Sequence, residues 1–120
     1  MYWQGTAEHL KKALREAADE KVILLQHIPF LCGTLAEASM HRWGKVLTLG
    51  GNLPERGSCQ ETAPDKIEDI RGIICGADNI KALICGHLHL DHVDMLAERL
   101  PQYVSTEGCF GEAALFEIHG

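Results

Sequence analysis

Apolar residues recur along the chain with two different spacings, and these spacings predict where helices and strands form. Over residues 7–18 the apolar positions fall three or four apart with charged residues between them, as on an amphipathic surface helix. The same spacing predicts a second helix that is capped near Thr62, has Pro64 in its first turn and ends at Gly76. Residues 35–43 are expected to add one or two helical turns.

Two short, mainly apolar runs, within residues 21–26 and 80–85, predict a different kind of element. Short runs without polar alternation are typical of strands covered on both faces, which occur in parallel sheets flanked by helices. Residues 103–106 and 113–119 are expected to form closing strands, and residues 95–100 a helical turn.

The order of these elements, with a short further strand over residues 45–49, predicts an α/β fold. The expected sheet is mixed, with two parallel buried strands and antiparallel strands toward the C-terminus. Residues 1–120 are expected to form a single domain. Ligands of such sheets bind at the carboxyl ends of the strands.

Three histidines follow the two apolar strands. His27 comes after the first strand and precedes Pro29, which cannot donate to a strand ladder and so ends the strand. His87 and His89 come after the second strand and follow Gly86. Because residues two apart point to the same side of an extended backbone, these two imidazoles are expected to face one side. Neutral imidazole is the commonest protein ligand of borderline metals, so the pattern predicts a metal site at this sheet edge.

Composition and charge narrow the choice of function. The net charge of -6 argues against a nucleic-acid-binding patch, which needs a basic face, but is compatible with a phosphorylated substrate beside bound cations. The five cysteines are odd in number and form no CxxC pair, which favours a reduced protein of the cytoplasm. No apolar run approaches the roughly 20 residues that span a bilayer, and the first residues form no secretory signal, so no membrane partner is expected.

These histidine-bearing segments resemble the C-terminal half of the calcineurin-like metallophosphoesterases. There, as here, an apolar strand ends in His-x-Pro (residues 22–30), a helix follows, and a second apolar strand ends in Gly-His-x-His (residues 82–89). The resemblance implies a partial αββα sandwich and hydrolysis of a phosphomonoester or phosphodiester by two divalent ions of manganese, iron or zinc. It also implies that His27 and His87 bind one metal and His89 the other, with a small phosphorylated molecule as substrate.

The family's other metal ligands are missing from this sequence. The Asp-x-His, Gly-Asp-x-x-Asp and Gly-Asn-His-Asp motifs of its N-terminal half do not occur, and no histidine follows Gly51-Asn52. We therefore expect the C-terminal part of a larger phosphoesterase domain, incomplete and weakly active alone. Its expected protein partner is a complementing N-terminal half or a second copy in a homodimer. A non-catalytic, degenerate assembly domain is the other interpretation of the missing ligands.

A different hydrolase fold offers an alternative interpretation. The His-x-His-x-Asp-His pattern that begins at His87 matches the zinc motif of the metallo-β-lactamase fold, in which the histidine pair binds one zinc and the Asp91-His92 pair the other. That fold gives no role to His27 and needs ligands further downstream. In the phosphoesterase interpretation, Asp91, His92 and Asp94 either orient the imidazoles or lie on a solvated loop.

Five other residues have weaker claims to a role in the site. His41 and Asn52 are not expected to be ligands. Trp43 is expected to cover the loop, and Cys75 and Cys85 are expected to be small core residues.

Overall fold

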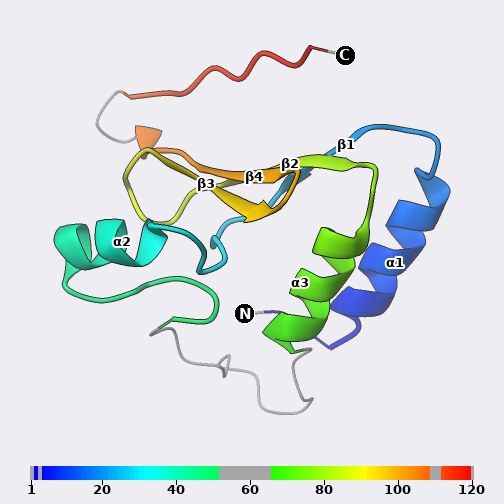
Figure 1. Cartoon of the computed structure of the whole chain (residues 1–120), viewed down its shortest axis with the longest axis horizontal. Helices are drawn as coiled ribbons and strands as arrows, with labels where there is room; N and C mark the ends of the chain where they lie inside the picture. Colours follow the sequence, from blue (N-terminus) through cyan, green and yellow to red (C-terminus); the bar gives the residue numbers. More distant parts are fainter. Residues whose placement is uncertain (1, 3, 52–65, 109–111, 120) are drawn as a thin grey trace.

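The structure, a computed structural model, describes residues 2, 4–51, 66–108 and 112–119. Its strands form one sheet in the spatial order β1-β2-β4-β3. These strands are β1 (Val22–Leu25), β2 (Ile80–Cys85), β3 (His92–Ala97) and β4 (Leu100–Val104). The helices are α1 (Thr6–Glu16), α2 (Leu35–Trp43) and α3 (Ile67–Gly76). Helices α1 and α3 lie against one face of the sheet, and residues 112–119 pass over the other face (Figure 1).

Strand β2 runs parallel to both of its neighbours, β1 and β4, and only the edge strand β3 is antiparallel. The predicted α/β class and the mixed sheet with two parallel apolar strands are therefore confirmed. The prediction that both of these strands are buried is wrong for β1, in which no residue is buried and Leu25 is 72% exposed.

The C-terminal strands β3 and β4 are antiparallel to each other as expected, but β4 also runs parallel to β2. After β2 the chain first forms β3 at the edge of the sheet. The β3–β4 hairpin then brings β4 back into the position between β2 and β3. The carboxyl ends of β1, β2 and β4 consequently meet at one edge of the sheet.

All three predicted helices form, with differences at their ends. Helix α1 ends at Glu16, two residues before the predicted end, and α2 occupies the predicted segment. Helix α3 ends at Gly76 as predicted and buries Ile70 and Ile74 from its apolar stripe. Its start is later than predicted, because its N-cap is Lys66, which has an extended backbone, and not Thr62; residues 62–65 lie outside the described residues.

The helical turn predicted over residues 95–100 is wrong. This segment belongs to the β3–β4 hairpin, whose turn consists of Glu98 and Arg99. Leu96 and Leu100 have a spacing that also suits a helix, but here they reach the core from two neighbouring strands. Apolar spacing over so few residues does not distinguish the two arrangements.

The strands predicted over residues 45–49 and 113–119 are also wrong. In the first segment only Leu49 makes a bridge, a parallel one to Phe30. The second segment joins no strand ladder and crosses the sheet face instead. Its ring contact is between Phe116 and Tyr103, whose centroids lie 5.4 Å apart. Strand formation requires a partner for the backbone groups, and the local sequence does not specify that partner.

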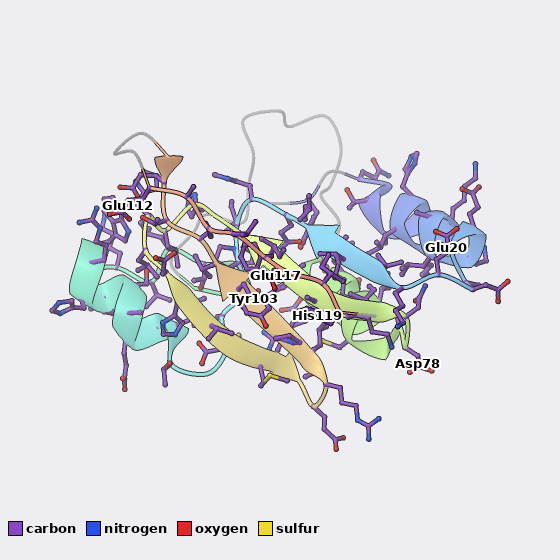
Figure 2. The ribbon with its side chains drawn as sticks, turned by 90° about the horizontal axis from the view of Figure 1, so that it is seen from above. Glu20, Asp78, Tyr103, Glu112, Glu117 and His119 are labelled. Atoms are coloured by element: carbon purple, nitrogen blue, oxygen red, sulfur yellow. The ribbon has the colours of Figure 1, made fainter. Side chains whose placement is uncertain are left out.

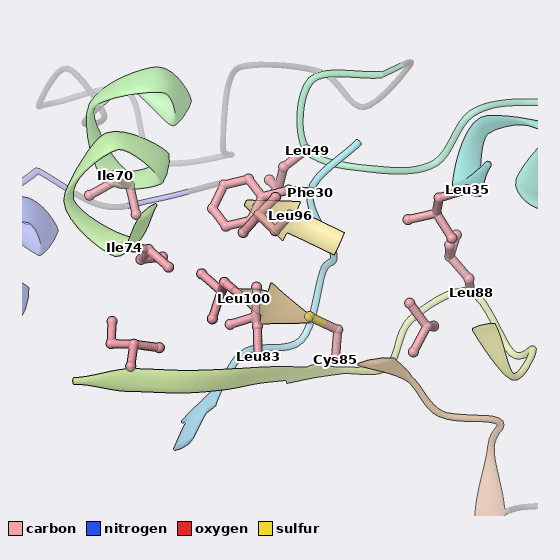
Figure 3. Packing of buried hydrophobic residues seen from close by; sticks show 12 residues of the cluster. Phe30, Leu35, Leu49, Ile70, Ile74, Leu83, Cys85, Leu88, Leu96 and Leu100 are labelled. Atoms are coloured by element: carbon pink, nitrogen blue, oxygen red, sulfur yellow. The ribbon is translucent and has the colours of Figure 1, made fainter. Parts of the chain in front are cut away.

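The core lies between the sheet and the pair of helices α1 and α3 (Figure 3). A register shift in the β1–β2 pairing leaves Lys81 without a partner in the ladder, since Val22 pairs with Ile80 and the next pair is Ile23 with Ala82. This bulge puts Ile80 and Leu83 on the same face although they are three residues apart, and both are buried.

The side chain of Gln102 in β4 provides the main polar contact of this core and is 1% exposed. Its amide oxygen accepts a hydrogen bond from the Phe30 N–H at 2.8 Å, and its amide nitrogen donates to the Phe30 carbonyl at 2.9 Å. The same nitrogen lies 3.4 Å from the Cys32 sulfur. The Gln102 amide therefore makes two hydrogen bonds to the Phe30 backbone of the kind that a neighbouring strand would make.

Replacing Gln102 with alanine is expected to lower the free energy of unfolding by about 2–4 kcal/mol, because the buried N–H and carbonyl of Phe30 lose their partner. Urea unfolding measures this loss. The exposed Gln4 offers a matched control, and Gln4→Ala should change stability by less than about 0.5 kcal/mol. Equal stability of the two variants would contradict the role given to Gln102.

Candidate metal centre

The β1–β2 and β2–β4 ladders continue one or two residues beyond the strands and fix the backbone of the site. The Gln26 N–H donates to the Ile84 carbonyl at 3.0 Å, and the Gly86 N–H donates to the His27 carbonyl at 2.9 Å. On the other side, the Ser105 N–H donates to the Cys85 carbonyl at 2.9 Å. Residues that follow β1, β2 and β4 are thus held next to one another at the carboxyl edge.

His27 and His87 meet at this edge, as the sequence predicts. The distance from His87 Nδ1 to His27 Nε2 is 3.3 Å. The two rings lie nearly perpendicular, with 5.0 Å between centroids and 78° between planes. The pair joins two strand ends that are 60 residues apart in the sequence.

The backbone around His87 is not extended, and the prediction that His87 and His89 share one side of an extended chain is wrong. Both residues have positive φ, 71° for His87 and 55° for His89. The Leu88 N–H donates to the Gly86 carbonyl at 2.8 Å, which makes His87 the central residue of a γ-turn. A γ-turn of positive φ is rare and strained, and such strain concentrates at functional sites.

The turn is fixed by Leu88, whose side chain is fully buried between the two histidines. The Trp43 indole N–H donates to the Leu88 carbonyl at 2.7 Å, so Trp43 covers the loop as predicted. Because Leu88 points into the core, the flanking imidazoles are directed to different neighbours.

The environment of His87 favours a neutral imidazole. Burial lowers its pKa from the usual range, and the neighbouring His27 and His89 lower it further because a positive charge there would repel theirs. The neutral form is the one that binds metal. Its Nε2 is buried and has no hydrogen-bond partner in the described part of the chain, an unusual state for a polar atom.

His89 contacts Trp43 and Glu107 rather than the His27–His87 pair. Its ring meets the Trp43 ring edge-on with 5.6 Å between centroids, and its Nδ1 lies 4.0 Å from Glu107 Oε1. Arg42 lies 3.9 Å from the same carboxylate oxygen. The predicted role of His89 as a ligand of a second metal stays a prediction.

Glu107 is a candidate functional residue that sequence reasoning missed. Its side chain is only 11% exposed. Hydrogen bonds from its own backbone N–H and from the Thr106 hydroxyl, with the nearby His89 and Arg42, hold the pKa of its carboxyl below the usual range despite the opposing effect of burial. Glu107 reaches the site because β4 is parallel to β2. The only feature of the sequence that could have indicated a role for Glu107 is its position just after the strand predicted over residues 103–106.

Asp91, His92 and Asp94 do not orient the histidine pair. Asp91 accepts a hydrogen bond from the Thr106 N–H at 3.0 Å. His92 Nε2 lies 2.8 Å from Asp94 Oδ2, and both side chains contact the Thr34 hydroxyl, at 2.9 Å and 3.2 Å. His92 and Asp94 therefore connect β3 to the segment before α2.

Of the remaining candidates, those that the structure describes lie outside the site. His41 is exposed on α2, and Asn52 lies outside the described residues. Cys85 is buried as predicted, and burial raises its pKa to about 12, but Cys75 is exposed on α3 rather than part of the core.

The donor set fits one metal ion only in part. Among the described residues, no group of three or more His, Cys, Asp or Glu side chains is placed to hold a metal. His27 and His87 would offer two imidazoles to one borderline divalent ion, and in the part of the chain that the structure describes no carboxylate is placed to bridge it to a second ion. None of the helices in the described part of the chain is long and apolar enough to cross a membrane.

Comparisons with protein-family models, with curated proteins and with solved structures find no match to this chain. The resemblance to calcineurin-like phosphoesterases therefore depends on the two histidine motifs and their placement.

The strained turn at His87 makes a prediction about stability. Glycine adopts positive φ without strain, whereas alanine pays about 1–2 kcal/mol there. We expect His87→Gly to be more stable than His87→Ala by about 1 kcal/mol, the reverse of the usual order. Thermal or urea unfolding of the two variants measures the difference. A more stable alanine variant would show that His87 does not have positive φ.

Proposed function

We propose that this chain carries the histidine ligands of a metal-dependent phosphoester hydrolase of the calcineurin-like type, with His27 and His87 binding one divalent ion. One observation supports this most directly: His27 Nε2 and His87 Nδ1 lie 3.3 Å apart. Two nitrogens bound to one ion at tetrahedral positions, about 2.0–2.1 Å from it, lie about 3.3–3.4 Å from each other.

The position of the pair agrees with this proposal. Ligand sites of parallel sheets lie at the carboxyl ends of strands, and His27 and His87 follow two adjacent parallel strands. The strained γ-turn, the lowered pKa of His87 and its buried, unpaired Nε2 are all features that accumulate at functional sites.

When bound, divalent ions of manganese, iron or zinc would polarise a phosphoryl oxygen and lower the pKa of a water ligand. The chain's own contribution is to hold the imidazoles at the sheet edge, with that of His87 kept neutral by its surroundings. Leu88 and Trp43 fix the loop that carries His87. His89 is proposed as a ligand of a second ion, and a small phosphorylated molecule as the substrate.

The proposal includes a source for the missing ligands. The carboxylates that bridge two ions would come from a complementing N-terminal half, and the sheet described above would be one layer of an αββα sandwich. Cys32, Cys75 and Cys85 are free thiols, which agrees with a reducing compartment and a cytoplasmic location.

The metallo-β-lactamase alternative has no support from the geometry. It requires Asp91 and His92 to bind a zinc next to His87 and His89, but Asp91 is hydrogen-bonded to Thr106, and His92 to Asp94. Within the described residues no observation favours this alternative.

Metal binding provides a direct test. The purified chain should bind Mn²⁺ in isothermal titration calorimetry, and His27→Ala or His87→Asn should weaken binding at least about tenfold. Asparagine tolerates positive φ, so His87→Asn keeps the turn and removes the imidazole. Thiols bind Mn²⁺ poorly, which limits interference from cysteine. The exposed His9 is the matched control, and His9→Ala should bind as the wild type does. Equal affinity in all four proteins would sink the proposal.

Activity provides a second test, in which the expected result is that the chain alone shows no hydrolysis. The chain alone should hydrolyse a chromogenic phosphodiester such as bis(p-nitrophenyl) phosphate no faster than Mn²⁺ in buffer. The reason is that three imidazoles without a bridging carboxylate hold two ions poorly. Robust metal-dependent turnover that is lost in His27→Ala would show instead that the chain is a complete enzyme.

A further inference from the structure

Trp43 presents an exposed aromatic ring beside the candidate metal centre. Among the Phe, Tyr and Trp side chains that the structure describes it alone is exposed, with an exposed fraction of 41%. Figure 1 and Figure 2 both show its helix, α2, at the end of the sheet opposite α1. The hydrogen bond to the Leu88 carbonyl uses only the indole N–H, so it does not account for the exposed part of the ring.

Three contacts hold the Trp43 ring in one orientation. Its N–H donates to the Leu88 carbonyl at 2.7 Å, and the ring of His89 meets it edge-on with 5.6 Å between centroids. The guanidinium carbon of Arg42 lies over the ring, 5.1 Å from the centroid. A side chain that is already ordered loses little conformational entropy when a ligand binds to it. Trp43 is thus pre-organised to stack with a flat group.

Arg42 indicates the charge of a matching ligand. Its side chain is 46% exposed, and its Nη2 lies 3.9 Å from the carboxylate of Glu107, which is longer than a hydrogen bond. A guanidinium binds phosphate through two parallel hydrogen bonds, which are stronger than an exposed contact with a ring or a distant carboxylate. A ligand that combines a flat ring with a phosphate therefore suits both Trp43 and Arg42.

We propose that Trp43 and Arg42 form a subsite for the aromatic part of a phosphoester substrate, whose ring stacks on Trp43. This inference rests on the proposed function, in which the phosphate lies at the His27–His87 pair. The carbonyl that holds the indole belongs to Leu88, the residue next to His87, so the ring is adjacent to the proposed metal. Stacking would move the Arg42 guanidinium off the ring, and the phosphate would replace the ring as its partner.

Two kinds of compound carry this chemistry. Nucleotides and aryl phosphates both join a flat aromatic ring to a phosphate. Aromatic side chains stack with any nucleobase because every base has a π-face, so the ring of Trp43 does not by itself select one base. The selection of aromatic over non-aromatic phosphoesters is the property that the subsite provides.

The fluorescence of Trp43 tests the stacking. The sequence holds two tryptophans, so Trp3→Phe leaves Trp43 as the one emitting indole of the full chain. In excess Mn²⁺, adenosine 5′-monophosphate (AMP) is expected to quench this emission saturably. AMP should bind at least about fivefold more tightly than ribose 5-phosphate, which has the same phosphate without the ring and is measured by competition. Phenyl phosphate distinguishes the two sources: binding tighter than that of AMP would support an aryl phosphate, and weaker binding a nucleotide.

Two substitutions of Trp43 form a matched pair. Trp43→Phe and Trp43→Leu both remove the N–H that holds Leu88, and they differ in the aromatic ring. In isothermal titration calorimetry, the phenylalanine variant should keep a preference for AMP over ribose 5-phosphate, and the leucine variant should bind the two equally. Circular dichroism verifies that each variant is folded. If either is unfolded, the fluorescence comparison decides.

The subsite and the proposed function can fail separately. Equal affinities of the Trp3→Phe chain for AMP and ribose 5-phosphate, or no saturable quenching by AMP up to about 10 mM, would overturn the subsite and leave metal binding untouched. If AMP quenches Trp43 equally without Mn²⁺ and after the further change His87→Asn, stacking on Trp43 is supported, and the assignment of the phosphate to the histidine pair is overturned.

Discussion

The buried amide of Gln102 is the contact on which the candidate site depends. The chain leaves the ladder after His27, and the fully buried Pro29 cannot donate to a strand. Phe30 then has a buried N–H and carbonyl, and Gln102 satisfies both. The Arg71 guanidinium adds a hydrogen bond at 2.7 Å to the Leu31 carbonyl. Because β4 lies between β2 and β3, one glutamine holds the segment after β1 against the centre of the sheet.

The sequence predicts those parts of the fold that depend on local spacing. Helices α1 and α3 have clear apolar stripes, and β1 and β2 are short, mainly apolar runs, so all four were predicted, although the start of α3 was placed too early. The position of β4 depends on which strands pair, which is a contact between distant parts of the chain. Taking β4 as antiparallel puts its carboxyl end at the wrong edge. Glu107 was therefore not expected near the histidines.

The geometry at the histidine pair shows why residue spacing within a motif does not by itself predict which side chains face the same side. Two-residue spacing puts His87 and His89 on one side only if the backbone is extended. Full burial of the Leu88 side chain is worth about 1.5–3 kcal/mol, which offsets much of the cost of about 1–2 kcal/mol for each of the two positive φ angles beside it. Packing of Leu88 therefore stabilises the turn, and the turn separates the imidazoles. The pairing of His27 with His87 was predictable, because it depends only on two parallel strands ending side by side.

The three histidines differ in how readily they could adjust to a metal. His87 is held by the γ-turn and by Leu88, and moving its backbone would break the contact between Trp43 and the loop. The His89 side chain is 43% exposed, and its rotation would cost only a ring contact with Trp43 and a 4.0 Å contact with Glu107, together on the order of 1 kcal/mol. The site thus combines a fixed imidazole, that of His87, with a movable one, that of His89. In the proposed enzyme, His87 would set the position of the first ion, and the position of the second would follow from the carboxylates supplied to it.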